Sequence, residues 1–315
     1  MKVVMINDCA SVGETFLKYM PINIEKQHVK RSRGFWSKTL GVTYRILRAY
    51  GDLYHVNYLL QDCYIAAHLG KKPLVGYSVG SDLRVVLKHR ILGRIVKYNL
   101  KTCDKIIVST PDLIGIAHTL RKDVEYLPPP VDKELFHPKP ILHHTGKKKV
   151  LIASNANWKG KGTDIAIKAL SQLEDEIDVS IIAHGSDFNK TVELAFSLGL
   201  DLKVLPKVPH ERMNEYYWNA DLIIDQFIGG CPGMTAIEAI ACNRPVVTYA
   251  SSAFSEYEEF QLRDINSEDK IVEAVREAYE DDKILKKQLE YVNMNHKADA
   301  VVSKLMRVYE SVIEN

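Results

Sequence analysis

Residues 221–249 read DLIIDQFIGGCPGMTAIEAIACNRPVVTY. The stretch begins with an apolar run that ends at Asp225, passes through a loop that contains Gly230 and Gly233, and continues as a helical pattern from Met234. Glycines before a helix let a diphosphate approach free backbone N–H groups and the positive end of the helix dipole. This strand, loop and helix predict an α/β protein with a phosphate-binding edge.

Apolar runs alternate with stretches of helical period on both sides of this segment, which is typical of βα units in a parallel sheet. In the first half we expect strands at Lys2–Ile6, Leu53–Val56, Pro73–Tyr77, Lys105–Val108 and Glu125–Leu127. In the second half we expect them at Lys149–Ala153, Asp178–Ala183, Leu202–Leu205, Asp221–Asp225 and Pro245–Tyr249. The tail from Ser267 is helical in character.

A proline-rich run, PPPVDKELFHPKPILHH at 128–144, separates the two halves. Prolines remove backbone donors and fix φ, so the run predicts an interdomain linker. We therefore expect two Rossmann-like domains, residues 1–143 and 144–296. Residues 297–315 are expected to form a helix that crosses back to the first domain.

We expect no signal for export. The N-terminus MKVVMINDCASVGE has acidic residues where a signal peptide needs an apolar run, and no uncharged apolar stretch reaches the length of a spanning helix. The 5 cysteines are scattered without C-x-x-C spacing, which argues against a disulfide framework or a zinc site. We expect a cytoplasmic protein.

Charge is distributed unevenly along the chain. Residues 1–146 contain 22 Lys and Arg against 12 Asp and Glu, whereas the remainder contains 20 against 28. The segment 25–41, EKQHVKRSRGFWSKTLG, adds Phe35 and Trp36 to several cations. Cations interleaved with aromatic rings favour an anionic membrane interface, and a solvated loop is the alternative. We expect peripheral membrane contact, and no nucleic-acid partner because no nucleic-acid-binding motif is present.

The glycine loop and its helix carry a resemblance. From Glu238 the chain reads E-A-I-A-C-N-R-P-V-V, which resembles the donor-binding signature of family 4 glycosyltransferases, E-x7-E followed by A-M-A-x-G-x-P-V-V. The resemblance implies the GT-B architecture, two Rossmann-like domains facing a central cleft. It also implies that Glu238 holds the ribose of a nucleotide sugar, and that the amides around Gly233, Met234 and Thr235 cradle its phosphates. Gly230 stands at the donor-binding position where the family has its first glutamate.

A second segment, SNANWKGKGTDIAIKAL at 154–170, resembles the family loop that ends in K-G before a helix. Lys161, followed by Gly162, takes the position of the lysine that binds the diphosphate, and the arginine position is Ala156. We expect Lys161 and Glu238 to carry the donor side of catalysis. His184 ends a strand at the same predicted edge and joins the expected donor site.

In the first half, VGSDLR at 79–84 resembles the H-G-S-D-x-R stretch that faces the cleft in this family. The histidine position is Val79. The matching residues are expected on the acceptor side, with Asp82 also expected in catalysis: Gly80, Ser81, Asp82 and Arg84.

Taken with the resemblance, these residues imply a glycosyltransferase that retains the anomeric configuration and acts on an unidentified sugar or lipid-linked acceptor. No D-x-D occurs, so we expect neither a metal nor a cofactor. Departures at Val79, Ala156 and Gly230 leave a non-catalytic nucleotide-sugar-binding protein as an alternative. Another GT-B enzyme, such as a nucleotide-sugar 2-epimerase, is a second alternative. A dinucleotide-dependent dehydrogenase is disfavoured because no G-x-G-x-x-G follows the first strand.

Overall fold

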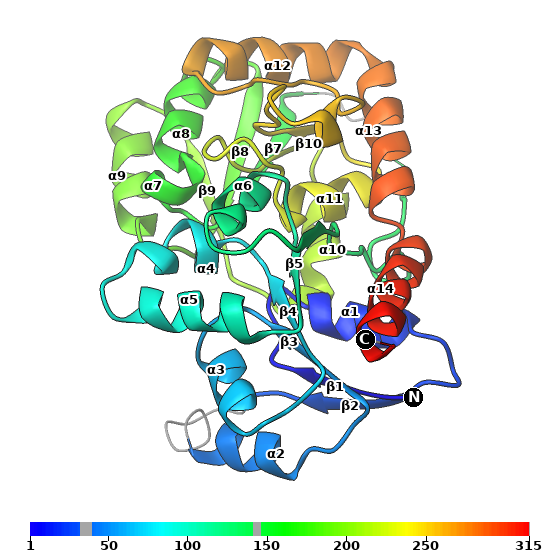
Figure 1. Cartoon of the computed structure of the whole chain (residues 1–315). Coiled ribbons are helices and arrows are strands. Elements are labelled where there is room, and N and C mark those ends of the chain that lie inside the picture. Colours follow the sequence, from blue (N-terminus) through cyan, green and yellow to red (C-terminus); the bar gives the residue numbers. More distant parts are fainter. Residues whose placement is uncertain (32–39, 141–145, 315) are drawn as a thin grey trace. The chain divides into compact units, whose positions relative to one another are not determined.

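The computed structural model describes residues 1–31, 40–140 and 146–314 (Figure 1). Contacts within the chain divide it into two compact units. Unit 1 comprises Met1–Pro130 and Lys297–Asn315, and unit 2 comprises Val131–His296. Each unit has its own parallel sheet, which confirms the predicted class of two Rossmann-like α/β domains.

Unit 1 contains a sheet in the order β2-β1-β3-β4-β5-β6, with every neighbouring pair parallel. Its strands are β1 (Lys2–Ile6), β2 (Glu25–Val29), β3 (Leu53–Asn57), β4 (Leu74–Ser78), β5 (Lys105–Val108) and β6 (Val124–Tyr126). β3 and β4 are buried along their whole length. Such continuous burial explains their apolar sequences, because helices cover both faces of a parallel sheet.

Strand β2 is absent from the sequence predictions. Its residues EKQHV are polar, and only Val29 is fully buried. The strand lies at the edge of the sheet and pairs with β1 alone. An edge strand tolerates polar side chains on exposed positions, so its sequence has no apolar run to reveal it.

The helices of unit 1 are α1 (Val12–Tyr19), α2 (Val42–Arg48), α3 (Gln61–His68), α4 (Ser81–Arg84), η2 (Val86–Lys88), α5 (Leu92–Thr102), α6 (Asp112–His118) and α14 (Ala298–Ile313). The C-terminal α14 packs beside α1 (red and blue in Figure 1). Val301, Leu305 and Tyr309 from α14 are buried in the same core as Val3 and Phe16. The last helix of the chain therefore completes the core of its first unit.

Unit 2 contains a sheet in the order β11-β10-β7-β8-β9. Its strands are β7 (Lys148–Ile152), β8 (Ile177–Ile182), β9 (Leu202–Leu205), β10 (Leu222–Ile224) and β11 (Val246–Val247). Its helices are α7 (Trp158–Lys161), α8 (Thr163–Ser171), α9 (Phe188–Ser197), η3 (His210–Arg212), α10 (Met213–Trp218), α11 (Met234–Ala241), η4 (Ser255–Tyr257), α12 (Glu268–Glu280) and α13 (Asp282–Asn295). The helical tail predicted from Ser267 is confirmed as α12, α13 and α14.

Residues 131–140 belong to unit 2, whereas the sequence analysis counted residues up to 143 with the first domain. Phe136 is 1% exposed in the unit 2 core. The guanidinium of Arg244 donates to the carbonyl of Lys139 at 2.9 Å. These contacts attach the segment to unit 2 although its prolines exclude it from the sheet.

Candidate functional site

The loops after β7 and β10 meet at the carboxyl edge of the unit 2 sheet, because these strands are parallel neighbours. Lys161 joins both loops. Its backbone carbonyl accepts a 2.7 Å hydrogen bond from the Phe227 N–H, and its Nζ donates to the side-chain oxygen of Gln226. Gly162 follows with φ 70°, and a Cβ there would lie 3.2 Å from the Ile228 side chain. The structure therefore brings Lys161 and Gly162 against the loop after β10.

Asp225 directly follows β10 and is 3% exposed. Its Oδ2 accepts a 2.7 Å hydrogen bond from the Gly233 N–H, and a Cβ on residue 233 would lie 2.9 Å from the same oxygen. Burial raises the pKa of Asp225, while the charge of Lys161 and the bond from Gly233 oppose that shift. Asp225 thus sets the position of the residue that precedes α11, and glycine is needed there for the close approach.

The helix α11 begins at Met234, after Gly233 in an extended conformation and without a side-chain cap. The N–H groups of Ala236 and Ile237 bond back to the Gly233 carbonyl. The first N–H groups of any helix lack acceptors within it, and the helix dipole makes this end positive. Met234 and Thr235 are half-buried. The start of α11 is consequently suited to an anion.

Glu238 lies on α11, and its side chain is 5% exposed. His210, from η3, donates through Nε2 to Glu238 Oε1 at 2.7 Å. The hydroxyl of Tyr217, from α10, donates to Oε2 at 3.0 Å. Burial, followed by the charge of Glu238, raises the pKa of Tyr217 well above its usual value, so this hydroxyl keeps its proton. Both carboxylate oxygens already have protein donors, and the imidazole, 31% exposed, is the solvent-facing member of the set.

Gly230 has φ 68°, in the left-handed region. Its carbonyl accepts a 2.9 Å hydrogen bond from the Ser251 N–H. A Cβ on residue 230 would lie 2.7 Å from the Ser251 Cβ. The conformation of this loop therefore has no space for the glutamate that the resemblance leads one to expect at this position.

His184 is exposed in the loop after β8. Its backbone carbonyl accepts a 2.8 Å hydrogen bond from the Ala156 N–H, which joins this loop to the one after β7. Burial, followed by the charge of Lys207, lowers the pKa of His184. Ala156 is 0% exposed. A Cβ on Gly185, the residue after His184, would lie 2.2 Å from the Ala156 carbonyl oxygen. This close approach to the Ala156 backbone accounts for the glycine at position 185.

On unit 1, Asp82 is 0% exposed at the carboxyl end of β4. Its two oxygens accept hydrogen bonds from four donors, the Ser78 hydroxyl and the N–H groups of Leu59, Gly80 and Leu83. Burial raises the pKa of Asp82, and these bonds oppose the shift. Such complete use of the carboxylate favours a structural role, and the catalytic role expected for Asp82 stays a prediction.

Arg84 binds within unit 1. Its guanidinium donates to both oxygens of Asp112, at 2.6 and 2.8 Å, and to the Thr110 hydroxyl at 2.7 Å. The hydroxyl of Ser81 lies 3.1 Å from that of Tyr58. The predicted acceptor-side residues thus lie together at the carboxyl edge of this sheet, where Asp82 and Arg84 connect neighbouring loops.

Four residues of the unit 2 site were not among the predicted site residues: His210, Tyr217, Asp225 and Gln226. A polar pair directly after an apolar strand was the only signal for Asp225 and Gln226. Nothing in the local sequence marks His210 or Tyr217, because they reach Glu238 only after η3 and α10 have packed near α11.

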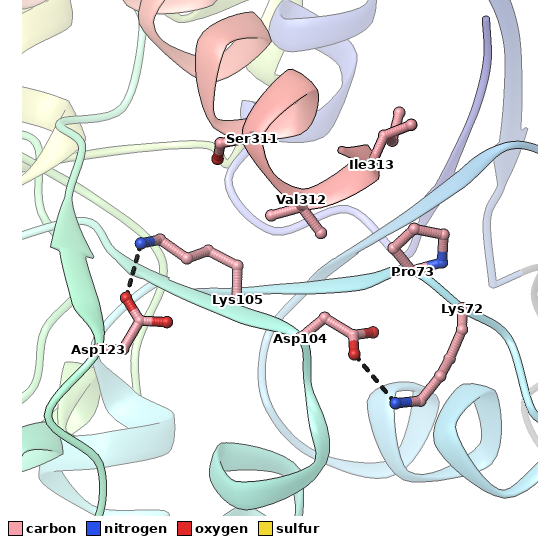
Figure 2. A pocket seen from close by; sticks show the side chains of 8 residues that line it. All are labelled: Lys72, Pro73, Asp104, Lys105, Asp123, Ser311, Val312 and Ile313. Atoms are coloured by element: carbon pink, nitrogen blue, oxygen red, sulfur yellow. Dashed lines mark hydrogen bonds and ion pairs between the residues drawn. The ribbon is translucent and has the colours of Figure 1, made fainter. Parts of the chain in front are cut away.

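A hollow of about 620 Å³ lies elsewhere on unit 1, between the starts of β4 and β5 and the end of α14 (Figure 2). Lys72 pairs with Asp104 at 3.0 Å and Lys105 with Asp123 at 2.8 Å. Its charged walls are therefore neutralised in pairs. The hollow lies at the amino ends of the strands, away from the carboxyl edge that carries Gly80 to Arg84.

Within residues 1–31, 40–140 and 146–314, no three His, Cys, Asp or Glu side chains are grouped so that they could share a metal ion. None of the helices in those ranges is both long enough and apolar enough to cross a membrane. Metal independence itself stays a prediction.

Comparisons of the sequence with known proteins identify relatives of one class. The family model for glycosyl transferases group 1 matches residues 133–296, more than half of the chain. Mannosylfructose-phosphate synthase from Agrobacterium fabrum is 30% identical over 190 residues, 53% of this chain and 41% of that protein. D-inositol 3-phosphate glycosyltransferase from Xylanimonas cellulosilytica is 25% identical over 243 residues, 63% of this chain and 55% of that protein. The chain spans about half the length of these curated relatives.

A solved structure of similar fold is that of Anabaena Alr3699/HepE in complex with UDP-glucose. It has a TM-score of 0.73 at 14% identity, over 99% of this chain and 100% of that one. The two parallel-sheet units match the GT-B fold of such structures. The matched family model and this fold together show that the chain belongs to the group 1 glycosyltransferases.

Proposed function

We propose that the chain is an enzyme that transfers a sugar from a nucleotide-sugar donor to a sugar or lipid-linked acceptor. The observation that carries this proposal is the arrangement at one edge of unit 2, where Lys161 lies against the loop that leads into α11. The positive start of α11 suits a diphosphate, and the compact charge of Lys161 adds to it. Glu238, one turn further along α11, is the proposed partner of the ribose hydroxyls.

The chemistry expected at this edge is stabilisation of the departing nucleotide diphosphate. Preorganised donors aimed at a developing charge lower the barrier without further reorganisation. The Lys161 ammonium and the amides of Met234 and Thr235 are the proposed donors. We further propose that no divalent metal takes part, since the sequence has no D-x-D, and that transfer retains the anomeric configuration, as the family resemblance implies.

Nucleotide binding tests the placement of the donor. Alr3699/HepE was crystallised with UDP-glucose, so UDP is the first ligand for calorimetry. Glu238→Ala is expected to weaken UDP binding by about 1.5–3 kcal/mol, the range for hydrogen bonds to a charged group. Tyr217→Phe is the matched control, because it removes a buried contact of Glu238 and keeps the carboxylate. Equal affinity in wild type and Glu238→Ala would place the nucleotide elsewhere.

A non-catalytic nucleotide-sugar-binding protein is the second candidate, favoured by the lack of space for a side chain at Gly230 and by the buried Ala156. Incubation with radiolabelled nucleotide sugars separates the two candidates. An enzyme is expected to release labelled sugar or a labelled product over time. Tight UDP binding with neither transfer nor slow hydrolysis would favour the binding protein.

A further inference from the structure

The helix α2 of unit 1 is apolar on two opposite faces. Val42 and Ile46 are 0% exposed and pack into the core. On the outward side, Tyr44 is 62% exposed and Leu47 53% exposed. Leu40, two residues before the helix, is 64% exposed. A surface helix normally presents polar residues to water, so this outward face calls for a partner.

The outward apolar side chains form one stripe. Positions 40, 44 and 47 are spaced by four and three residues, the spacing that places side chains on one side of a helix. Tyr50, 74% exposed, lies two residues after the end of α2. We call Leu40, Tyr44, Leu47 and Tyr50 the α2 stripe. It contains two tyrosines, whose rings have an apolar body and a polar tip.

The α2 stripe lies in a basic segment of the sequence. Between Glu25 and Asp52 the chain has seven Lys and Arg and no Asp or Glu, and of these Lys30 and Arg31 pair with acids elsewhere in unit 1. Arg48 is exposed at the end of α2. Next to it, the Lys71 ammonium donates to the carbonyls of Leu47 and Ala49, at 3.0 and 2.7 Å. The end of the helix that holds these cations is therefore positive despite its own dipole.

The sheet topology sets the direction in which α2 runs. β2 ends at Val29 on the carboxyl edge, and β3 begins at Leu53 on the amino edge, because the strands are parallel. The chain between them returns from one edge to the other, and α2 lies in this return, on the outside of unit 1 beside α3 (Figure 1). The start of α2 thus faces the carboxyl edge of the sheet, the edge that also carries Gly80 to Arg84.

We propose that the α2 stripe rests on an anionic lipid bilayer, with its apolar side chains in the headgroup layer and Arg48 and Lys71 near the lipid phosphates. Apolar residues flanked by cations are the chemistry of helices that lie in such an interface. A second copy of this chain fits less well, since a twofold interface would bring Arg48 of each copy toward the α2 of the other, a helix that contains no acidic residue. The proposal does not depend on glycosyl transfer.

The basic segment 25–41, which the sequence analysis assigned to membrane contact, is a less suitable place for test substitutions. Residues 32–39 lie outside the described residues. Lys30 pairs with Glu14, and Arg31 binds both oxygens of Asp62, at 2.8 and 2.9 Å. The Asp62 side chain is 1% exposed, so replacing Arg31 would leave a buried carboxylate without its partner. Substitutions on the α2 stripe therefore test lipid binding more cleanly than substitutions of Lys30 and Arg31.

The experiment is co-flotation of the full chain with vesicles of phosphatidylcholine, with or without an equal amount of phosphatidylglycerol. The wild type should float with the anionic vesicles only, and less so as salt is added. The double variant Tyr44→Ser and Leu47→Ser should show a partition coefficient at least about 10-fold lower. The matched control, Ile22→Ser and Phe196→Ser, replaces side chains that are 101% and 87% exposed and should bind as the wild type does.

Circular dichroism of each variant tests whether it is folded. Arg48→Glu is a second variant, outside the core, that should also weaken vesicle binding. Equal flotation with neutral and anionic vesicles, or with neither, overturns the proposal. So does wild-type binding by the Tyr44 and Leu47 double variant. A dimer in sedimentation velocity that the same double variant dissociates would show that a second copy covers this face instead.

Discussion

Replacing the buried histidine of unit 1, His55→Phe, should remove a large pH-dependent loss of stability. His55 lies on β3 and is 0% exposed, and its Nδ1 lies 2.7 Å from the Tyr309 hydroxyl on α14. Burial lowers the pKa of His55 to about 3, with the side chain of Asn57 opposing the shift. The folded chain thus holds this imidazole neutral at pH values where a free histidine is charged.

The magnitude follows from the difference between the two pKa values. In the unfolded chain His55 has a pKa of about 6.5, so between that pH and about pH 3 the unfolded state binds a proton that the folded state does not. Stability therefore falls as the pH drops through this window. At about pH 5, about 1.5 units below the unfolded value, the loss is about 2 kcal/mol at about 1.4 kcal/mol per unit.

Urea unfolding followed by circular dichroism at pH 7 and pH 5 measures this loss in both proteins. Phenylalanine keeps a ring beside Phe16 and Tyr77, whose centroids lie 5.7 Å from that of His55. Titrating groups other than residue 55 contribute equally to the change in unfolding free energy of both proteins, so their contributions cancel when the two changes are subtracted. The wild type should lose about 2 kcal/mol more than His55→Phe on acidification. Equal losses would mean that His55 is not held neutral, and would refute the reasoning.

Three other substitutions or treatments test the sites. Gly233→Ala should weaken UDP binding in calorimetry, because its Cβ would lie 2.9 Å from Asp225 and displace the start of α11; unchanged affinity would remove this loop from the donor site. Asp82→Asn should lower the free energy of unfolding by about 1–3 kcal/mol, since an amide group cannot accept all the N–H donors around it. A stability equal to wild type would contradict the structural role of Asp82. Addition of EDTA should leave initial transfer rates within a few-fold, and loss of activity that Mn²⁺ restores would reject the metal-free mechanism.

The periodicity of apolar residues was sufficient to predict the fold class. Each strand or helix of a parallel α/β sheet shows its pattern of buried positions within its own short stretch of sequence. Continuous apolar runs such as Leu74–Ser78 are buried on both faces, and helical runs such as Glu268–Glu280 bury one stripe. The edge strand Glu25–Val29 was not predicted, because its polar residues face water and form no apolar run. The glycine before α11 was also predicted, because a glycine loop followed by a helix can be recognised within one short stretch of sequence.

Only the tertiary structure decided which groups surround each functional side chain. Glu238 takes its donors from His210 and Tyr217, 28 and 21 residues away, and no local pattern connects these positions. Tyr309 reaches His55 across 254 residues, which places the last helix in the first unit. The sequence showed Asp82 as a candidate catalyst, but its burial and four donors depend on how the loops after β3 and β4 pack. Residue types can be read along the chain, whereas desolvation and hydrogen-bond partners arise only when distant segments exclude water together.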